Sequence, residues 1–203
     1  MEDNAALLIV DVQNDFCPGG ALQVHDGDRV VGPINRAALC FAAAGLPVLA
    51  SRDWHPPVSR HFREFGGVWP VHCVQGTEGA AFNPALHLPE GAVVLSKGTN
   101  AEQDGYSAFE GSTDDGRPLA AVLKERGVRY LYICGLATDY CVLSTTREAL
   151  ASGFGVTVLT DAVAGVDLLP GASASAIEEM KNAGARLATV AGLQAAATGK
   201  RPE

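Results

Sequence analysis

The sequence predicts an open, doubly wound α/β fold: a three-layer sandwich with a parallel sheet between helices. Short, strongly apolar runs are spaced widely along the chain, which is typical of strands buried on both faces of a parallel sheet. The expected strands are 6–10, 47–51, 92–96, 129–134, 155–160 and 186–190. The segments between them have helical character, and each ends at a glycine, where helices commonly terminate. The expected helices are 28–44, 119–126, 139–152 and 173–183.

Length and composition indicate one globular domain over 1–203. The chain is 47% apolar and 19% charged, and its 23 acidic and 15 basic residues leave a net charge of −8. Since no Lys/Arg run is present, we expect neither nucleic acid nor a membrane as partner. The apolar run 5–10 is too short for a signal peptide or a membrane span, so a cytoplasmic location is expected. The five cysteines, without a CxxC pair, suggest no disulfide framework and no zinc knuckle.

Two connections are too long for ordinary loops, which marks them as functional. They are 52–91, the expected metal and substrate loop, and 98–118; the end of the chain, 198–203, is expected to be a flexible tail. In a sheet of this type, ligands bind outside the carboxyl ends of the strands. We therefore expect the reactive residues to gather at that edge.

The segment 130–142, YLYICGLATDYCV, is the centre of the predicted site. It begins as a strand, breaks at Gly135 and resumes as a helix at Thr138 and Asp139, so Cys141 falls in the first helical turn. A thiol at that place lies near the positive end of the helix dipole, and we expect its pKa to be lowered from the usual value of about 8.5. The backbone N–H groups of the same turn can accept an oxyanion.

Asp11 and Lys97 directly follow the first and third expected strands. A buried carboxylate costs free energy without a partner, and lysine is rarely buried unpaired. Together with Cys141 they suggest a catalytic group in which Lys97 favours the thiolate, Asp11 takes up the thiol proton and Cys141 attacks.

A metal site is predicted at the end of the second strand. Asp53 and His55 are two positions apart, so their side chains lie on the same side of an extended chain. His61 and His72 follow on the long loop, and Glu64 is an alternative to His61 as the last ligand. Carboxylate and imidazole ligands suit zinc, iron and manganese alike.

Three aromatic residues, Phe16, Trp69 and Tyr106, stand in separate loops at the same edge. Each alone is expected to cover the core. Together they can line a narrow slot for a flat ring.

At this point several stretches resemble the nicotinamidase/pyrazinamidase branch of the isochorismatase-like cysteine hydrolases. They are DVQNDFCPGGAL, SRDWHPP, WPVHCVQGTEGA, SKGTN with YSAFEG, and CGLATDYCV, and they occur in the family's order between about Ala6 and Gly165. The resemblance implies a six-stranded parallel sheet flanked by helices. It also implies that Asp11, Lys97 and Cys141 form the catalytic triad.

Further expectations come from the same resemblance. It implies a cis peptide bond between Leu136 and Ala137, which aims the amides of Ala137 and Cys141 into an oxyanion hole. Leu136 and Ala137 join Phe16, Trp69 and Tyr106 as the substrate-binding residues. A single divalent metal ion, zinc first and iron or manganese as alternatives, holds the pyridine nitrogen. The D-x-H pair and the later histidine separate this branch from isochorismatases and from many carbamoyl or ureido amidohydrolases, which share the triad.

The expected function is hydrolysis of nicotinamide to nicotinate and ammonia, and of pyrazinamide likewise, through a thioester on Cys141. The partner is then a small molecule, and the protein a monomer or homodimer. One alternative is a different amide or ureido hydrolase with the same triad. Another is a catalytically silent relative that binds a ligand.

Overall fold

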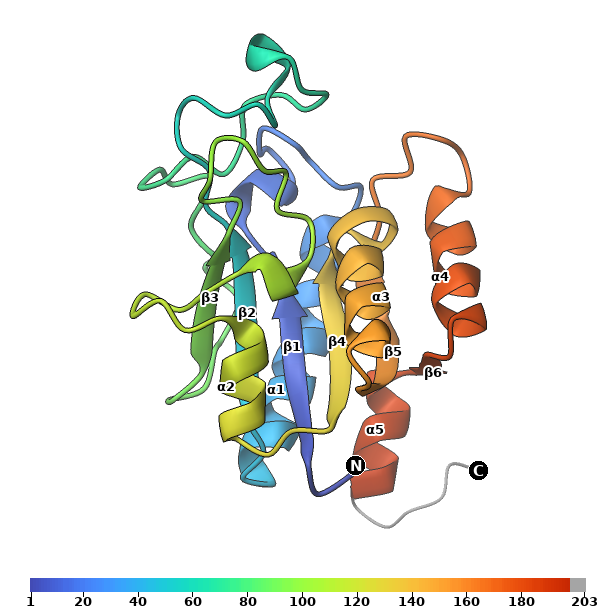
Figure 1. The fold of residues 1–203 in the computed structure, drawn as a ribbon. Helices are drawn as coiled ribbons and strands as arrows, with labels where there is room; N and C mark the ends of the chain where they lie inside the picture. The colour runs from blue at the N-terminus through green and yellow to red at the C-terminus, as the bar shows by residue number, and fades with distance from the viewer. Residues whose placement is uncertain (198–203) are drawn as a thin grey trace.

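A computed structural model of the chain describes residues 1–197; the predicted tail, 198–203, lies outside them. The described part contains a six-stranded, all-parallel sheet in the order β3-β2-β1-β4-β5-β6 (Figure 1). The strands are β1 (Ala5–Val10), β2 (Val48–Asp53), β3 (Val93–Lys97), β4 (Tyr130–Leu136), β5 (Gly155–Ala164) and β6 (Arg186–Ala188). Strand order reverses between β1 and β4, which confirms the doubly wound prediction.

Helices cover both faces of the sheet (Figure 1). One face packs against α1 (Val31–Ala43) and α5 (Val190–Ala197), and the other against α2 (Leu119–Glu125), α3 (Leu143–Ala151) and α4 (Ala172–Asn182). Strand β1 shows why its sequence is apolar throughout. Leu7 and Ile9 face the α1 layer, while Leu8 and Val10 face the α2 and α3 layer, and all four are fully buried.

The glycines predicted to end the first four helices do so. Gly45, Gly127, Gly153 and Gly184 follow α1 to α4, and each has a positive φ that an L side chain rarely adopts.

Two local expectations were wrong. The sixth strand ends at Ala188, and α5, which the sequence analysis did not predict, begins two residues later, where the Asp161 carboxylate accepts the Val190 N–H at 2.8 Å. Strand β4 does not break at Gly135 but passes through it. The helix does resume at Thr138 with Cys141 in its first turn, as predicted; this turn is π-helical, η5 (Thr138–Val142), and runs directly into α3.

Gly135 explains how β4 continues. Its φ is +113°, and a Cβ on it would lie 2.0 Å from the carbonyl oxygen of Val10 on the neighbouring strand. The pairing of β4 with β5 shifts register between Ile133 and Gly135. Only glycine therefore lets β4 run this close to the end of β1.

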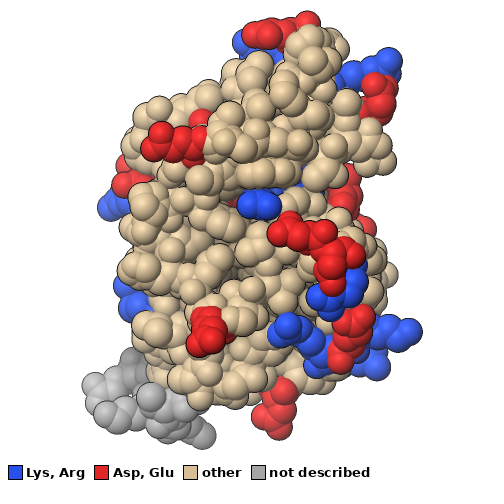
Figure 2. Space-filling view, turned by 90° about the vertical axis from the view of Figure 1, so that its left-hand side faces the viewer, with Lys and Arg blue, Asp and Glu red and all other residues tan. Residues whose placement is uncertain are grey.

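The carboxyl ends of the central strands meet at one edge, and the two long loops lie above it (Figure 1). Asp53 and Lys97 are register partners at the ends of β2 and β3. Among the described residues, the structure has no helix long and apolar enough to cross a membrane. On the face seen in Figure 2, acidic and basic side chains are interspersed and form no large patch of one sign.

Candidate functional site

Lys97 is the centre of a buried ionic group at the end of β3. Its ammonium lies 2.8 Å from Asp11 Oδ2, donates to Gly105 O at 2.8 Å and donates to Asp53 Oδ1. Lys97 is fully buried. Burial lowers the pKa of Lys97, but the two carboxylates outweigh it and hold that pKa well above its ordinary value. The lysine is therefore a permanent cation at the strand ends.

Asp11 follows β1 with a φ of +50° and is fully buried. Its Oδ1 accepts a hydrogen bond from Ser51 Oγ at 2.7 Å. Burial raises the pKa of Asp11 to about 6, with Lys97 acting in the opposite direction. A carboxyl with this pKa can exchange a proton near neutral pH.

Cys141 lies beside this pair. Lys97 Nζ is 3.4 Å from its Sγ, and the side-chain atoms of Asp11, Asp53 and Cys141 lie within 4.8 Å of one another. Burial raises the pKa of the Cys141 thiol well above its ordinary value, although Lys97 lowers it. The lowered pKa expected from the helix dipole is thus wrong, because only 7% of Cys141 is exposed and burial dominates. The thiol is protonated at rest and needs a proton acceptor.

Asp53 joins this ionic group to the histidines. Its Oδ1 faces Lys97, while its Oδ2 lies 3.8 Å from His55 Nε2 and 3.9 Å from His72 Nε2. Burial raises the pKa of Asp53, but Lys97 and the histidines hold it well below its ordinary value, so the carboxylate is ionised. Gln13, which was not predicted as a site residue, holds Asp53 in place: its buried side chain accepts from Asp53 N and donates to Asp53 O, both at 2.7 Å.

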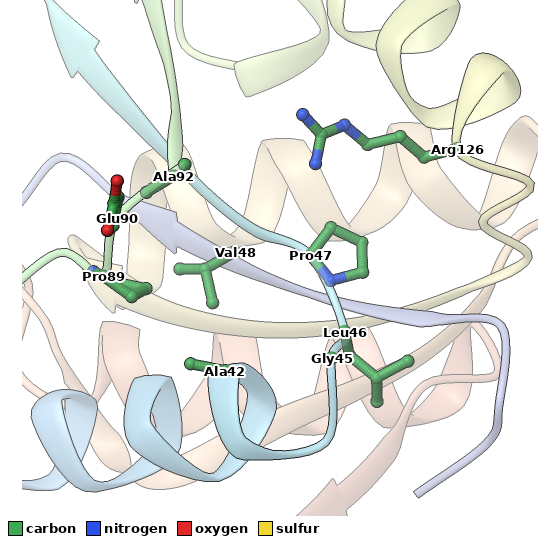
Figure 3. Close-up of a pocket in the computed structure, with 10 residues that line it drawn as sticks. Ala42, Gly45, Leu46, Pro47, Val48, Pro89, Glu90, Ala92 and Arg126 are labelled. Atoms are coloured by element: carbon green, nitrogen blue, oxygen red, sulfur yellow. The ribbon is translucent and has the colours of Figure 1, made fainter.

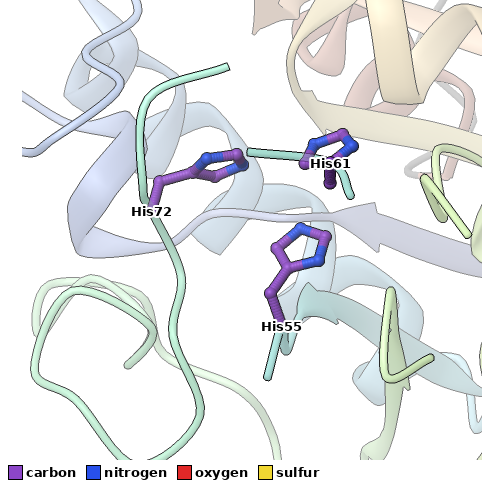
Figure 4. A group of neighbouring side chains, drawn as sticks. All are labelled: His55, His61 and His72. Atoms are coloured by element: carbon purple, nitrogen blue, oxygen red, sulfur yellow. The ribbon is translucent and has the colours of Figure 1, made fainter. Parts of the chain in front are cut away.

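The structure brings His55, His61 and His72 together, with ring nitrogens within 4.8 Å of one another (Figure 4). All three side chains are buried. Each ring is held through Nδ1: His55 by Gly98 O at 3.1 Å, His61 by Asp104 Oδ1 at 2.9 Å and His72 by Pro70 O at 2.8 Å. With the proton on Nδ1, every Nε2 is left as a free acceptor, which is the arrangement of metal-binding histidines.

These side chains fit a divalent cation. Within residues 1–197, His55 Nε2 is buried without a hydrogen-bond partner, at a cost of about 1–3 kcal/mol that a bound cation would remove. Burial lowers the pKa of His72 to about 4, so its ring is neutral at pH 7, the form that binds metal. Asp53 supplies the negative charge. The alternative ligand Glu64 is exposed in η3 (Arg63–Phe65) and is not among these side chains.

A small cavity of about 30 Å³ adjoins Cys141. The predicted residues Phe16, Trp69, Tyr106 and Ala137 line it. Leu136 does not: it is fully buried in the core, because its side chain packs with the α1 layer.

The peptide bond between Leu136 and Ala137 is cis, as the resemblance implied. Trp69 Nε1 donates to the Tyr106 hydroxyl at 2.9 Å, and Tyr140 packs edge-on against Trp69 at 4.8 Å between ring centroids.

Tyr140 and Val166 also line the cavity, although neither was predicted from the sequence. Tyr140 directly precedes the candidate nucleophile, which was a usable signal. Val166 lies just beyond β5, and its place depends on contacts far apart in the sequence.

A family model of the isochorismatase domain matches residues 5–192. Nicotinamidase of Escherichia coli K12 is 43% identical over 205 residues, covering 92% of this chain and 95% of that protein. Pyrazinamidase of Pyrococcus horikoshii in complex with zinc matches with a TM-score of 0.84 and 46% identity, covering 92% of this chain and 99% of that one. PnC1 of L. infantum in complex with nicotinate matches with a TM-score of 0.82 and 36% identity, covering 94% and 96%. The chain therefore belongs to the isochorismatase-domain family, alongside nicotinamidases and pyrazinamidases.

Proposed function

We propose that this chain is a nicotinamidase, a metal-dependent cysteine amidohydrolase that converts nicotinamide to nicotinate and ammonia and also accepts pyrazinamide. One observation carries the proposal: the buried Asp11, Lys97 and Cys141 group opens into an aromatic-lined cavity that also borders the histidine group. Relatives named nicotinamidase and pyrazinamidase support the same reaction.

In the first half of the proposed reaction, Cys141 Sγ attacks the carboxamide carbon while the thiol proton passes to Asp11. Lys97 stabilises the developing negative charge on sulfur. The carbonyl oxygen becomes an oxyanion, which accepts hydrogen bonds from the amides of Ala137 and Cys141. Asp11 then returns the proton to the amide nitrogen, the C–N bond breaks and ammonia leaves a thioester on Cys141.

The second half reverses these roles. Asp11, again a carboxylate, takes a proton from a water molecule, whose oxygen attacks the thioester carbon. The oxyanion uses the same two amides. When the C–S bond breaks, the proton on Asp11 returns to sulfur, and the nicotinic acid that leaves gives its own proton to solvent to become nicotinate. The pKa of Asp11, raised to about 6 by burial, suits a group that both takes and gives a proton near neutral pH.

Asp53, His55, His61 and His72 are the proposed metal ligands, and zinc is the proposed metal. A divalent cation held by these residues would supply a Lewis acid for the ring nitrogen of the substrate. The zinc complex of the Pyrococcus horikoshii relative supports this identity. Iron and manganese are the competing metals, since the ligand types suit all three.

Phe16 and Trp69 are proposed to contact the two faces of the pyridine ring, with Tyr106 at its edge. All three side chains line the cavity beside Cys141. The proposed location of the protein is the cytoplasm, and its proposed oligomeric state is a monomer or homodimer. Its proposed partner is a small-molecule substrate and not a nucleic acid.

The test is ammonia release from nicotinamide by the purified protein. Activity is measured as isolated, after chelation, and after zinc, iron or manganese is added back, with bound metal determined on each sample. We expect release to fall on chelation and to return with zinc. Parallel assays with pyrazinamide and with a ureido compound separate the proposed function from other amide hydrolases.

Ammonia release from the ureido compound but not from nicotinamide would move the substrate to another class. If ammonia release is unchanged after chelation, in protein shown to be free of metal, the reaction does not require a metal.

A further inference from the structure

We propose that Asp139 is a positioning residue that holds Val166 as one wall of the substrate pocket, and that this wall limits the size of the ring the enzyme accepts. The inference rests on the proposed hydrolysis of an aromatic amide. It concerns a residue outside the triad and the histidine group.

The Asp139 carboxylate holds two consecutive backbone amides. Its Oδ1 accepts from Val166 N and its Oδ2 accepts from Asp167 N, both at 2.9 Å. Hydrogen bonds from a backbone N–H to a carboxylate are stronger than those between neutral groups. Because each oxygen binds a different amide, the bonds fix the direction of the chain as well as its distance from η5.

Asp139 therefore connects two parts of the pocket. It lies in η5, two residues before Cys141, while Val166 follows β5 and lines the same cavity as Cys141 and Tyr140. The turn that carries the candidate nucleophile thus also carries the group that anchors the opposite segment. The separation between Cys141 and the Val166 wall is consequently set through the Asp139 side chain.

A second anchor fixes the far side of this segment. Asp167 has a φ of +50°, and its carboxylate accepts from Ser173 N at 2.8 Å and from Ser173 Oγ at 2.7 Å. The backbone at Gly165 passes closely between Ser173 and Asp139: a Cβ on Gly165 would lie 1.7 Å from Ser173 Oγ and 3.0 Å from Asp139 Oδ1. Without Asp139, the segment 165–167 keeps its attachment to α4 and loses its attachment to η5, so its wall can move away from Cys141.

The functional test compares nicotinamide with a larger ring amide, quinoline-3-carboxamide. In Asp139→Ala we expect KM for nicotinamide to rise roughly tenfold while kcat falls less than about threefold, because two hydrogen bonds to the wall are lost and the triad is unchanged. The preference for nicotinamide over quinoline-3-carboxamide, as the ratio of kcat/KM values, should fall roughly tenfold. Val166→Ala should lower that preference similarly while Asp139 remains in place.

Asp139→Asn covers the case in which the alanine variant folds poorly. Its carboxamide retains one oxygen acceptor but turns an NH₂ group toward a backbone N–H, so an intermediate loss of preference is expected. Asp161→Ala is the matched control, since Asp161 also accepts a backbone N–H, from Val190 at 2.8 Å, at the start of α5 and away from the pocket. It should leave the substrate preference unchanged.

Hydrogen exchange of the unliganded protein tests the clamp without any substrate. The amides of Val166 and Asp167 should exchange roughly tenfold faster in Asp139→Ala than in the wild type, and not in Asp161→Ala. Unchanged exchange at these amides, or an unchanged preference in both Asp139 variants, would overturn the inference. If the wild type releases no ammonia from nicotinamide, the proposed function fails, and the exchange measurement alone still decides whether Asp139 holds the wall.

Discussion

The two ends of the sheet carry very different cavities. At the carboxyl end, the cavity beside Cys141 has a volume of about 30 Å³ and adjoins buried aspartate, lysine and histidine side chains. At the amino end, a cavity of about 450 Å³ is lined by Leu46, Pro47 and Val48, with Glu90 and Arg126 at its rim (Figure 3). Both of these charged residues are exposed to solvent.

Buried charged side chains therefore indicate the functional site better than the volume of a cavity does. Exposed charges such as Glu90 and Arg126 are screened by water and contribute little. Buried charges are costly unless partners compensate them, and at the carboxyl end Lys97 is paired with Asp11 and Asp53. Strand direction produces the asymmetry, because the carboxyl ends of parallel strands deliver their following residues to one edge.

The largest effect is expected from removing the nucleophile. Cys141→Ala should lower turnover of nicotinamide by about 10⁴-fold or more, since Cys141 supplies the thiol that contacts Lys97 Nζ, at 3.4 Å. Metal content and the unfolding transition should stay as in the wild type. Cys40→Ala, on α1, is the matched control and should retain full activity. Turnover by the Cys141 variant above the level of contaminating enzyme would end the nucleophile assignment.

The next effect concerns the histidine group. His72→Ala should weaken metal binding by about 100-fold or more and raise KM, because one of three converging ring nitrogens is removed. Metal affinity is measured by calorimetry on metal-stripped protein. His25→Ala serves as the control, since the His25 side chain is 90% exposed. An unchanged affinity would exclude His72 from the metal site.

The buried carboxyl should appear in the pH dependence. Burial raises the pKa of Asp11 to about 6, so lowering the pH through that value protonates the group that must accept the Cys141 proton. We expect kcat/KM to fall about tenfold per pH unit below this value, with an apparent pKa well above the ordinary 3.8 of an aspartate. Metal content is determined at every pH, so that loss of metal is not mistaken for protonation. A flat profile from pH 7 to pH 4.5 would remove Asp11 as the base.

A smaller effect on metal affinity is expected at Asp104, which holds the ring of the proposed metal ligand His61. Asp104 is largely exposed, yet its Oδ1 holds His61 Nδ1 at 2.9 Å. Asp104→Ala should weaken metal affinity about tenfold, because the His61 ring is no longer oriented. Glu102→Ala is the control on the same loop, where the carboxylate pairs at 3.0 Å with exposed Arg60 instead. Equal metal affinities in the Asp104 and Glu102 variants would show that Asp104 does not orient His61 for metal binding.

The smallest effect is expected at the amino end. Arg126→Ala removes the cation at the rim of the larger cavity and should change kcat/KM for nicotinamide less than about twofold, because an exposed charge at the opposite edge acts through screened electrostatics. A change of tenfold or more, with stability unchanged, would break the contrast between the two ends.

Much of the site follows from strand endings alone. Asp11 and Lys97 were predicted because a charged residue directly follows an apolar strand, and the structure brings both to Cys141. The histidines were predicted from the D-x-H pair and the length of the following loop, and they do converge. Their catalytic and metal-binding roles stay predictions until the variants are measured.

Other features could not be predicted, because they depend on groups that meet only in three dimensions. Gln13 holds Asp53 across 40 residues, and Asp139 holds Val166 across 27. Neither pairing has a local periodicity or spacing that predicts it. The direction of the Cys141 pKa was missed for the same reason: the dipole of a nearby turn is visible in the sequence, whereas the extent of burial is not.

The sequence by itself determined the succession of the six strands and of α1 to α4 along the chain, the edge at which polar residues gather and the reactive groups present there. These features are local, because apolar runs, glycine stops and the residue after each strand specify them. Only the tertiary structure decided that one lysine lies between two carboxylates, that each histidine is held through Nδ1, and that the thiol is buried. Distances between loops and the loss of water around a charge are properties of the folded chain as a whole.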